Sequence, residues 1–244
     1  MALLIRVTLA MDEQWTKSYW NPLTRAVQRE VQKACAEICR QFPEVEFVLT
    51  PQVRQWNSPD ILMMRDFPWS LLWDLSRNFS AREMIQELSR RMENIGLSPI
   101  SPEEQERIAS RFRRRSREYQ WGFLETYLAT DLLQHFLKSL KDRIPTESRE
   151  FILGFTGRVF APPRDYACVG LAMQQRNHAV FPMEHSGGRS TTILHEMGHL
   201  LGAEHPEDER VPSVMDPHGR GITDFDPKNI ECIRQHIQVL VSSA

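Results

Sequence analysis

His195-Glu196-Met197-Gly198-His199-Leu200-Leu201-Gly202-Ala203-Glu204-His205 is the most informative stretch of the chain. It is predicted to continue a helix that begins at Ser190 or Thr191. Two histidines four positions apart on a helix lie about 40° apart around its axis and about 6 Å apart along it. The imidazoles of His195 and His199 therefore reach one metal ion from one face. Glu196 lies about 100° around the helix from His195. Its carboxylate would stand beside the ion, outside its coordination shell, where it can take a proton from a metal-bound water.

Gly202 is predicted to end this helix. It follows His199 by three positions, where a glycine in the left-handed conformation stops a helix and turns the chain. The turn brings His205 back as a third ligand. Three nitrogen ligands leave the fourth tetrahedral position of a zinc ion open for water, which is typical of catalytic zinc sites. The sequence thus predicts one catalytic Zn²⁺ held by His195, His199 and His205, with Glu196 as the general base. A helix with only two histidines and a glutamate arises by chance, but the added glycine and third histidine make the pattern far more specific.

This pattern resembles the signature of the metzincin zinc metallopeptidases, H-E-x-x-H-x-x-G-x-x-H followed by a methionine turn. Ser213-Val214-Met215-Asp216-Pro217 stands where that turn is expected. The resemblance implies that Met215 forms a hydrophobic floor under the three histidines. It also implies that the segment 216–223 walls the pocket beyond the scissile bond. The residues that it implies for binding the substrate backbone, as an edge strand, are Val169, Gly170, Leu171 and Ala172.

The metzincin subfamily stays unresolved. Pro206, directly after the third histidine, is similar to the serralysins. However, Pro217 replaces the tyrosine that serralysins and astacins carry after the turn methionine, and the glycine-rich calcium repeats of serralysins are absent. Without that tyrosine, the zinc ion would have to carry most of the oxyanion charge.

The rest of the chain predicts an α+β, α/β-like fold. Residues 3–9 and 44–50 have strand character and flank a helix that starts at Pro22, a unit that favours parallel pairing. Further strands are expected at 150–156, 167–173 and 177–184. A last helix has an apolar face formed by Phe225, Ile230, Ile233, Ile237, Leu240 and Val241. By resemblance, these elements form a twisted, mostly parallel metzincin-type sheet with one antiparallel edge strand, an active-site helix, a methionine turn and a C-terminal helix.

Residues 1–244 are predicted to form a single metzincin-like catalytic domain. Within it, 61–148 is predicted to be a largely helical insertion between the second and third strands. Arginines gather at 111–117, but acidic residues lie close by, so we interpret this cluster as a solvated helix face.

The composition and net charge limit the classes of molecule that the protein is expected to bind. The chain has 244 residues, of which 41% are hydrophobic and 25% charged, as in soluble globular proteins. Its net charge of −2 gives no electrostatic case for nucleic acid or an anionic membrane. No apolar run reaches the roughly 18 residues of a membrane helix, and Arg6 interrupts the apolar N-terminus. We therefore expect a peptide or protein substrate, no nucleic acid, no membrane and a cytoplasmic location. The oligomeric state stays open.

The resemblance implies a zinc-dependent endopeptidase. One alternative is a zinc aminopeptidase, as in the archaemetzincins, or another amide hydrolase, although the extra cysteine zinc site of that group is missing. The other alternative is a non-catalytic, zinc-containing binding module. The presence of Glu196 argues against it, because a site that only binds needs no general base.

Overall fold

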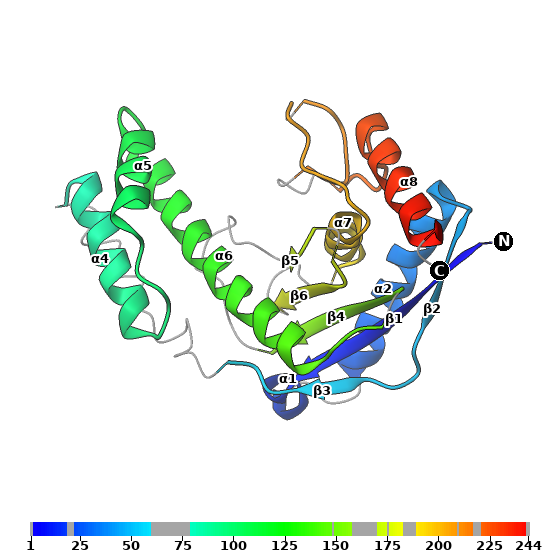
Figure 1. The fold of residues 1–244 in the computed structure, drawn as a ribbon. Coiled ribbons are helices and arrows are strands. Elements are labelled where there is room, and N and C mark those ends of the chain that lie inside the picture. The colour runs from blue at the N-terminus through cyan, green and yellow to red at the C-terminus, as the bar shows by residue number, and fades with distance from the viewer. Residues whose placement is uncertain are drawn as a thin grey trace. The chain divides into compact units, whose positions relative to one another are not determined.

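A computed structural model describes residues 2–18, 22–59, 79–147, 149–157, 170–174, 176–182, 189–208, 210–216 and 221–242. Its centre is a six-stranded sheet in the order β2-β1-β4-β6-β5, with β3 also paired to β1 (Figure 1). β1 is parallel to β2, β3 and β4, and β4 is parallel to β6. β5 is antiparallel to β6. The strands are β1 (Leu3–Asp12), β2 (Val45–Leu49), β3 (Arg54–Trp56), β4 (Glu150–Thr156), β5 (Leu171–Ala172) and β6 (His178–Pro182). This mostly parallel sheet with one antiparallel edge confirms the predicted fold class.

β3 is an element that the sequence did not predict. It pairs with β1 from Ala10 to Asp12, whereas β2 pairs with β1 from Leu3 to Val7. β2 and β3 thus pair with successive parts of β1. Pro51 lies between them and lacks the N–H that a continuous ladder needs.

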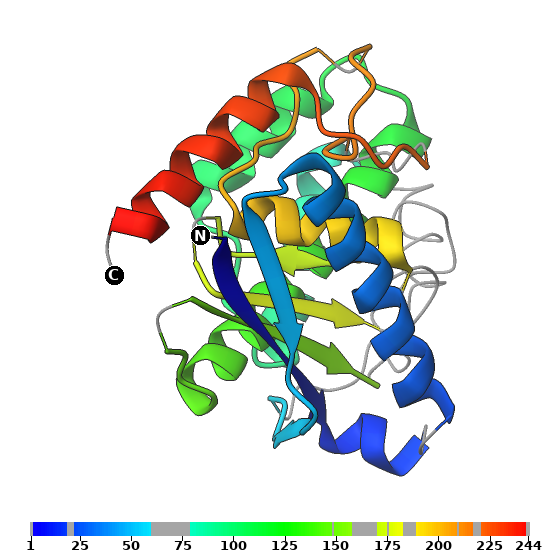
Figure 2. The same cartoon turned by 90° about the vertical axis from the view of Figure 1, so that its right-hand side faces the viewer.

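The chain divides into two compact units. The unit that contains the sheet comprises residues 1–58, 136–158 and 169–244. Its helices are α1 (Glu13–Ser18), α2 (Pro22–Gln41), α7 (Ser190–Leu200) and α8 (Pro227–Ser242). Figure 2 shows α2 and α7 side by side on one face of the sheet.

Strand alternation decides which side chains meet these helices. Successive residues of a strand point to opposite faces, so Ile5, Val7 and Leu9 share one face, and all three join the buried cluster that includes residues of α2 and α7. On the other face, Gly154 of β4 lies against Leu140, with no room for a side chain at the glycine. The sheet is therefore covered on both faces, as parallel sheets require.

Asp12 joins the end of β1 to α1 and to β4. Its carboxylate accepts hydrogen bonds from Trp15 N at 2.8 Å, from Gly157 N at 3.0 Å and from the Thr156 hydroxyl. The bond from Trp15 caps the N-terminus of α1. Asp12 is fully buried, so its oxygens depend on these donors for their hydrogen bonds.

We expect Asp12→Ala to lower the free energy of unfolding by about 1.5–5 kcal/mol. Loss of a helix cap costs roughly 0.5–2 kcal/mol, and donors left unsatisfied in the interior cost about 1–3 kcal/mol more. Urea denaturation of the wild type and the variant measures the difference. An unchanged midpoint would show that these bonds contribute nothing to stability.

The second unit comprises residues 59–135 and 159–168. Its described helices are α4 (Ala81–Asn94), α5 (Pro102–Phe112) and the first part of α6 (Arg117–Arg143). All three lie in the range 61–148, predicted to be a helical insertion, of which residues 61–78 and 148 lie outside the described residues. The division falls within α6, because residues from Phe136 onward belong with the sheet. The helices also follow β3 rather than the second strand, because β3 is an additional strand.

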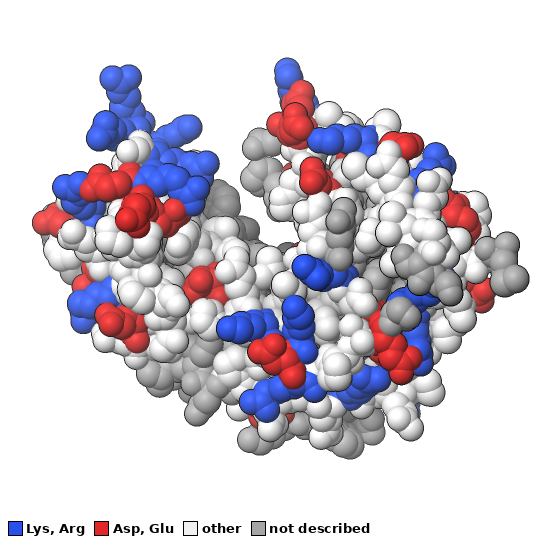
Figure 3. All heavy atoms as spheres, viewed as in Figure 1, with Lys and Arg blue, Asp and Glu red and all other residues white. Residues whose placement is uncertain are grey.

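The arginines at 111–117 contact aromatic rings of their own unit. The guanidinium of Arg111 lies 5.4 Å from the ring centroid of Phe123, and that of Arg115 lies 5.0 Å from the ring of Tyr119. On the face seen in Figure 3, basic and acidic side chains are interspersed over both parts of the chain. No described helix is long and apolar enough to cross a membrane.

Candidate metal centre

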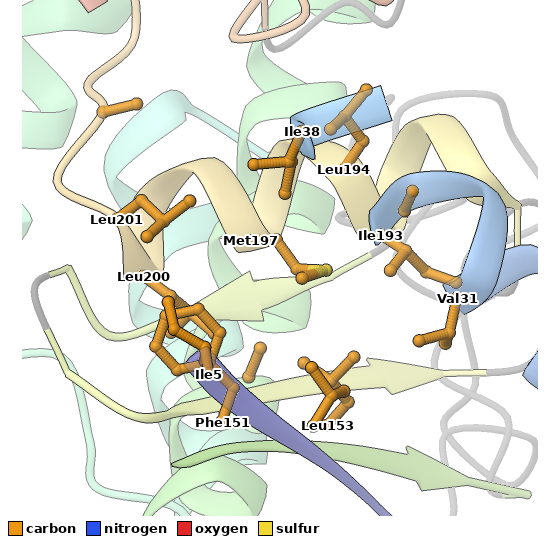
Figure 4. Packing of buried hydrophobic residues seen from close by; sticks show 14 of the residues in the cluster. Ile5, Val31, Ile38, Phe151, Leu153, Ile193, Leu194, Met197, Leu200 and Leu201 are labelled. Atoms are coloured by element: carbon orange, nitrogen blue, oxygen red, sulfur yellow. The ribbon is translucent and has the colours of Figure 1, made fainter. Parts of the chain in front are cut away.

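α7 carries the first two histidines and is held firmly between α2 and the sheet. Ile193, Leu194, Met197 and Leu200 are buried, and they recur at the spacing of one helix face. Figure 4 shows Ile193 and Leu194 beside residues of α2, and Met197 and Leu200 directed toward the strands. The opposite face of α7, which carries His195 and His199, is left free for other contacts.

Gly202 terminates α7. Its φ is +95°, a conformation that glycine adopts without strain. Gly202 N donates to His199 O at 3.0 Å, and Ala203 N donates to Gly198 O at 2.9 Å. This pair of bonds is a Schellman motif, which satisfies the last carbonyl groups of the helix and turns the chain toward His205.

The structure brings His195, His199 and His205 together. The Nε2 atom of His205 lies 3.2 Å from Nε2 of His195 and 3.2 Å from Nε2 of His199. One ligand atom from each residue lies within 4.8 Å of the others. The three rings therefore point at a common position.

The other ring nitrogens show why this position suits a cation. His195 Nδ1 lies 2.8 Å from Val214 O, and His199 Nδ1 lies 2.9 Å from Ala203 O. A carbonyl only accepts, so each Nδ1 carries the proton and each Nε2 presents a lone pair. Lone pairs that face one another at this distance repel unless a cation lies between them. The donor set fits Zn²⁺, which prefers imidazole nitrogen.

Burial keeps these imidazoles neutral. It is the largest cause that lowers the pKa of His195 and of His199 to about 4, and the neighbouring imidazoles act in the same direction. Burial also lowers the pKa of His205, although the carboxylate of Asp216 acts in the opposite direction. Since only a neutral imidazole binds a metal, the three rings are ready ligands at neutral pH.

Glu196 lies beneath the edge strand. It is buried, and a Cβ built on Gly170 would lie 2.8 Å from its Cγ and Oε1 atoms. Burial raises the pKa of Glu196 to about 8, while a hydrogen bond from the Ala172 N–H acts to lower it. A cation held by the adjacent histidines would also favour the ionised carboxylate. Glu196 thus connects the histidine site with β5.

Met215 lies under α7. It is fully buried, and a Cβ built on Gly198 would lie 2.6 Å from its sulfur and 2.7 Å from Cε1 of Phe225. The turn that carries it is closed by Asp216 N, which donates to Ser213 O at 3.1 Å. Only a residue without a side chain at 198 allows the methionine to pack this closely against the helix.

Gly198→Ala should therefore destabilise the protein. Overpacking of this kind costs about 1–3 kcal/mol and opposes the ~1 kcal/mol by which alanine is the better helix former. We expect a lower midpoint in urea together with weaker zinc binding, because Gly198 lies on the helix that carries His195 and His199 and packs against Met215. An alanine variant more stable than the wild type would contradict the close packing.

β5 forms the edge of the sheet next to the site. Met173 N donates to His178 O at 3.2 Å, and Leu171 and Ala172 pair with Val180 and Ala179. In an antiparallel pair, alternate residues direct their backbone groups away from the partner strand, so Ala172 presents its N–H and C=O outward. Of the residues predicted to bind the substrate backbone, Gly170, Leu171 and Ala172 lie here, and Val169 lies outside the described residues.

A buried polar cluster near the histidines was not predicted. Asp226 accepts from the Ser213 hydroxyl at 2.7 Å and from Asn229 Nδ2 at 2.6 Å. Burial raises the pKa of the Asp226 carboxyl, but these hydrogen bonds outweigh it and hold the pKa below its usual range. In the sequence, Asp226-Pro227 before an apolar run indicates a helix start, yet nothing local shows what the side chains bind.

Comparison with known proteins leaves the function open. No protein-family model and no curated protein matches the sequence. An archaemetzincin from Methanopyrus kandleri is similar in structure at 14% identity over 96% of each chain, with a TM-score of 0.42. A zinc-dependent peptidase from Methanocorpusculum labreanum is similar at 14% identity over 93% of this chain and 99% of its own, with a TM-score of 0.40. A chain from a chaperone-substrate complex is similar at 11% identity over 98% of this chain and 34% of its own, with a TM-score of 0.43. We draw no functional conclusion from similarities of this degree.

Proposed function

We propose that this protein is a zinc-dependent endopeptidase with a single catalytic Zn²⁺. The observation that carries the proposal is the convergence of three imidazole Nε2 atoms, two of them 3.2 Å from the third, beside a buried carboxylate. His195, His199 and His205 would hold the ion. The resemblance of the motif to the metzincin signature gives the reaction class.

Glu196 is proposed as the general base and acid. A zinc ion supplies Lewis acidity at such a site, since it lowers the pKa of a water ligand toward about 7 and polarises a carbonyl. The Glu196 carboxylate would take the proton of the attacking water and deliver it to the leaving amine. Its packing on Gly170 and its hydrogen bond from Ala172 N–H hold it in one orientation.

β5 is proposed to bind the substrate backbone. The outward C=O of Ala172 allows an extended peptide to add as a further strand, while the outward N–H of Ala172 already donates to Glu196. Glu196 contacts this same strand, so a peptide bond aligned there would lie near the base. Val169 is part of the proposed edge but lies outside the described residues.

Two other functions remain as alternatives, a zinc aminopeptidase or other amide hydrolase and a zinc-containing binding module. A binding module has no use for a carboxylate buried beside the metal ligands, since isolating an ionisable group from water destabilises the fold. The single-domain arrangement with 61–148 as a helical insertion also stays a proposal.

Incubation of the zinc-loaded protein with a proteome-derived peptide library, followed by mass spectrometry of the products, separates these functions. Internal cuts that disappear when a chelator removes the zinc support an endopeptidase. Trimming from N-termini alone would identify an aminopeptidase. Intact peptides with zinc bound would overturn the proposal in favour of a binding module or of a hydrolase that acts on other amides.

A further inference from the structure

The ring of His205 is held differently from the other two. His195 and His199 project from α7, and the Nδ1 atom of each bonds to a backbone carbonyl, of Val214 and Ala203 respectively. His205 follows the end of the helix and is more exposed than His195 and His199. Among the described residues, its ring makes polar contacts with the Nε2 atoms of the other two imidazoles and hydrogen-bonds no backbone carbonyl. Its position therefore depends on the backbone that carries it.

Asn229 clamps that backbone. Its Oδ1 accepts from Glu204 N at 2.8 Å, and its Nδ2 donates to Glu204 O at 2.9 Å. Glu204 directly precedes His205. Asn229 is 2% exposed, so neither bond is exchanged readily for a bond to water. Both polar groups of one peptide residue are thus tied to the first turn of α8.

Asp226 fixes the orientation of this amide. Its carboxylate accepts from Asn229 Nδ2 at 2.6 Å, and because a carboxylate only accepts, Oδ1 of the amide must face Glu204 N. The carboxylate also accepts from the hydroxyl of Ser213, which in turn accepts from Met215 N at 3.1 Å. One buried cluster therefore holds the segment before His205 and the turn that carries Met215.

We propose that Asn229, oriented by Asp226, is a positioning residue of the metal centre that sets the place of His205 and thereby the affinity for zinc. The inference rests on the proposed function, because it assumes that the three histidines bind zinc. Asn229 acts only through the backbone of Glu204.

Asn229→Asp in the full-length chain tests the inference. The variant keeps the size of the side chain but replaces the donor Nδ2 by an oxygen. That oxygen would face two other acceptors, Glu204 O and the carboxylate of Asp226. We expect the zinc affinity, measured by competition with a chelator, to fall about 10- to 100-fold, as for other residues that support metal ligands. The visible absorption of the Co²⁺-loaded variant should also change, since it reports the ligand geometry.

Asp12→Asn is the matched control. Asp12 is another buried side chain that bonds to backbone N–H groups, those of Trp15 and Gly157, and its described partners do not include the histidines or Met215. We expect this variant to lose stability and to keep the wild-type zinc affinity and Co²⁺ spectrum. If Asn229→Asp binds zinc as tightly as the wild type, the inference is wrong but the proposed function stands. The same conclusion follows if Asn229→Asp and Asp12→Asn lose equal amounts of zinc affinity. A wild type that binds no zinc would overturn the proposed function as well.

A second measurement needs no variant and applies if Asn229→Asp does not fold. In the metal-free wild type, the amide hydrogen of Glu204 should exchange as slowly as the amide hydrogens in the interior of α8, because the clamp exists without zinc. Exchange as fast as in an exposed loop would overturn the inference.

Discussion

Glu196→Gln should lower kcat/KM for a cleaved peptide by about 10²- to 10⁴-fold, the usual contribution of a general acid–base group. The amide has the shape of the carboxyl group and still accepts the hydrogen bond of Ala172 N–H, so the packing on Gly170 is kept. It cannot take a proton from water. We expect the variant to bind zinc as the wild type does, because Glu196 is not a ligand.

A quenched fluorescent peptide built on a cleavage site from the library measures the rates, and elemental analysis measures the zinc content. Glu150→Gln is the control. Glu150 is also buried, and its Oε1 accepts from the Thr8 hydroxyl at 2.7 Å, so this variant makes the same change in the same unit. It should turn over substrate at the wild-type rate. Full turnover by Glu196→Gln would refute the assigned mechanism.

His199→Ala should abolish tight zinc binding and, with it, cleavage. His199 Nε2 lies 3.2 Å from His205 Nε2, and its Nδ1 is fixed by Ala203 O at 2.9 Å, so the variant loses one of the three ligand atoms that meet at this position. Zinc at about 100 times its Kd should stabilise the wild type by about 2.7 kcal/mol. Thermal unfolding with and without zinc should show this gain in the wild type and none in the variant.

His236→Ala serves as the control for histidine loss. His236 lies on α8, outside the triad, so its replacement should leave the zinc-dependent stabilisation intact. If His199→Ala gained as much stability from zinc as the wild type, the ion would bind elsewhere in the chain.

The parts of the fold that depend on the spacing of nearby residues could be predicted from the sequence. β4 has the predicted bounds, and α2 begins at Pro22 as predicted, because alternating or helical spacing of apolar residues reports the element that buries them. Likewise, the spacing of residues within 195–205 predicts both the helix and its end at Gly202. The convergence of the three histidines follows from 3.6 residues per turn and one left-handed glycine.

The parts that depend on distant partners could not be predicted. α1 is capped by Asp12, whose other partners, Thr156 and Gly157, lie far along the chain. The point at which α6 passes from one unit to the other has no mark in its apolar pattern, because the buried apolar positions continue from Trp121 to Leu140 on both sides of it. The clamp of Asn229 on Glu204 is another contact between distant segments, which the spacing of residues cannot reveal.

The central claim, that three imidazoles hold one zinc ion, is tested most directly by anomalous scattering. Crystals of the zinc-loaded protein, measured above and below the zinc absorption edge, should show a single strong peak about 2.0–2.1 Å from the Nε2 atoms of His195, His199 and His205, the usual Zn–N distance. Zinc-loaded crystals with no peak at this position, or with their only peak elsewhere, would contradict the account.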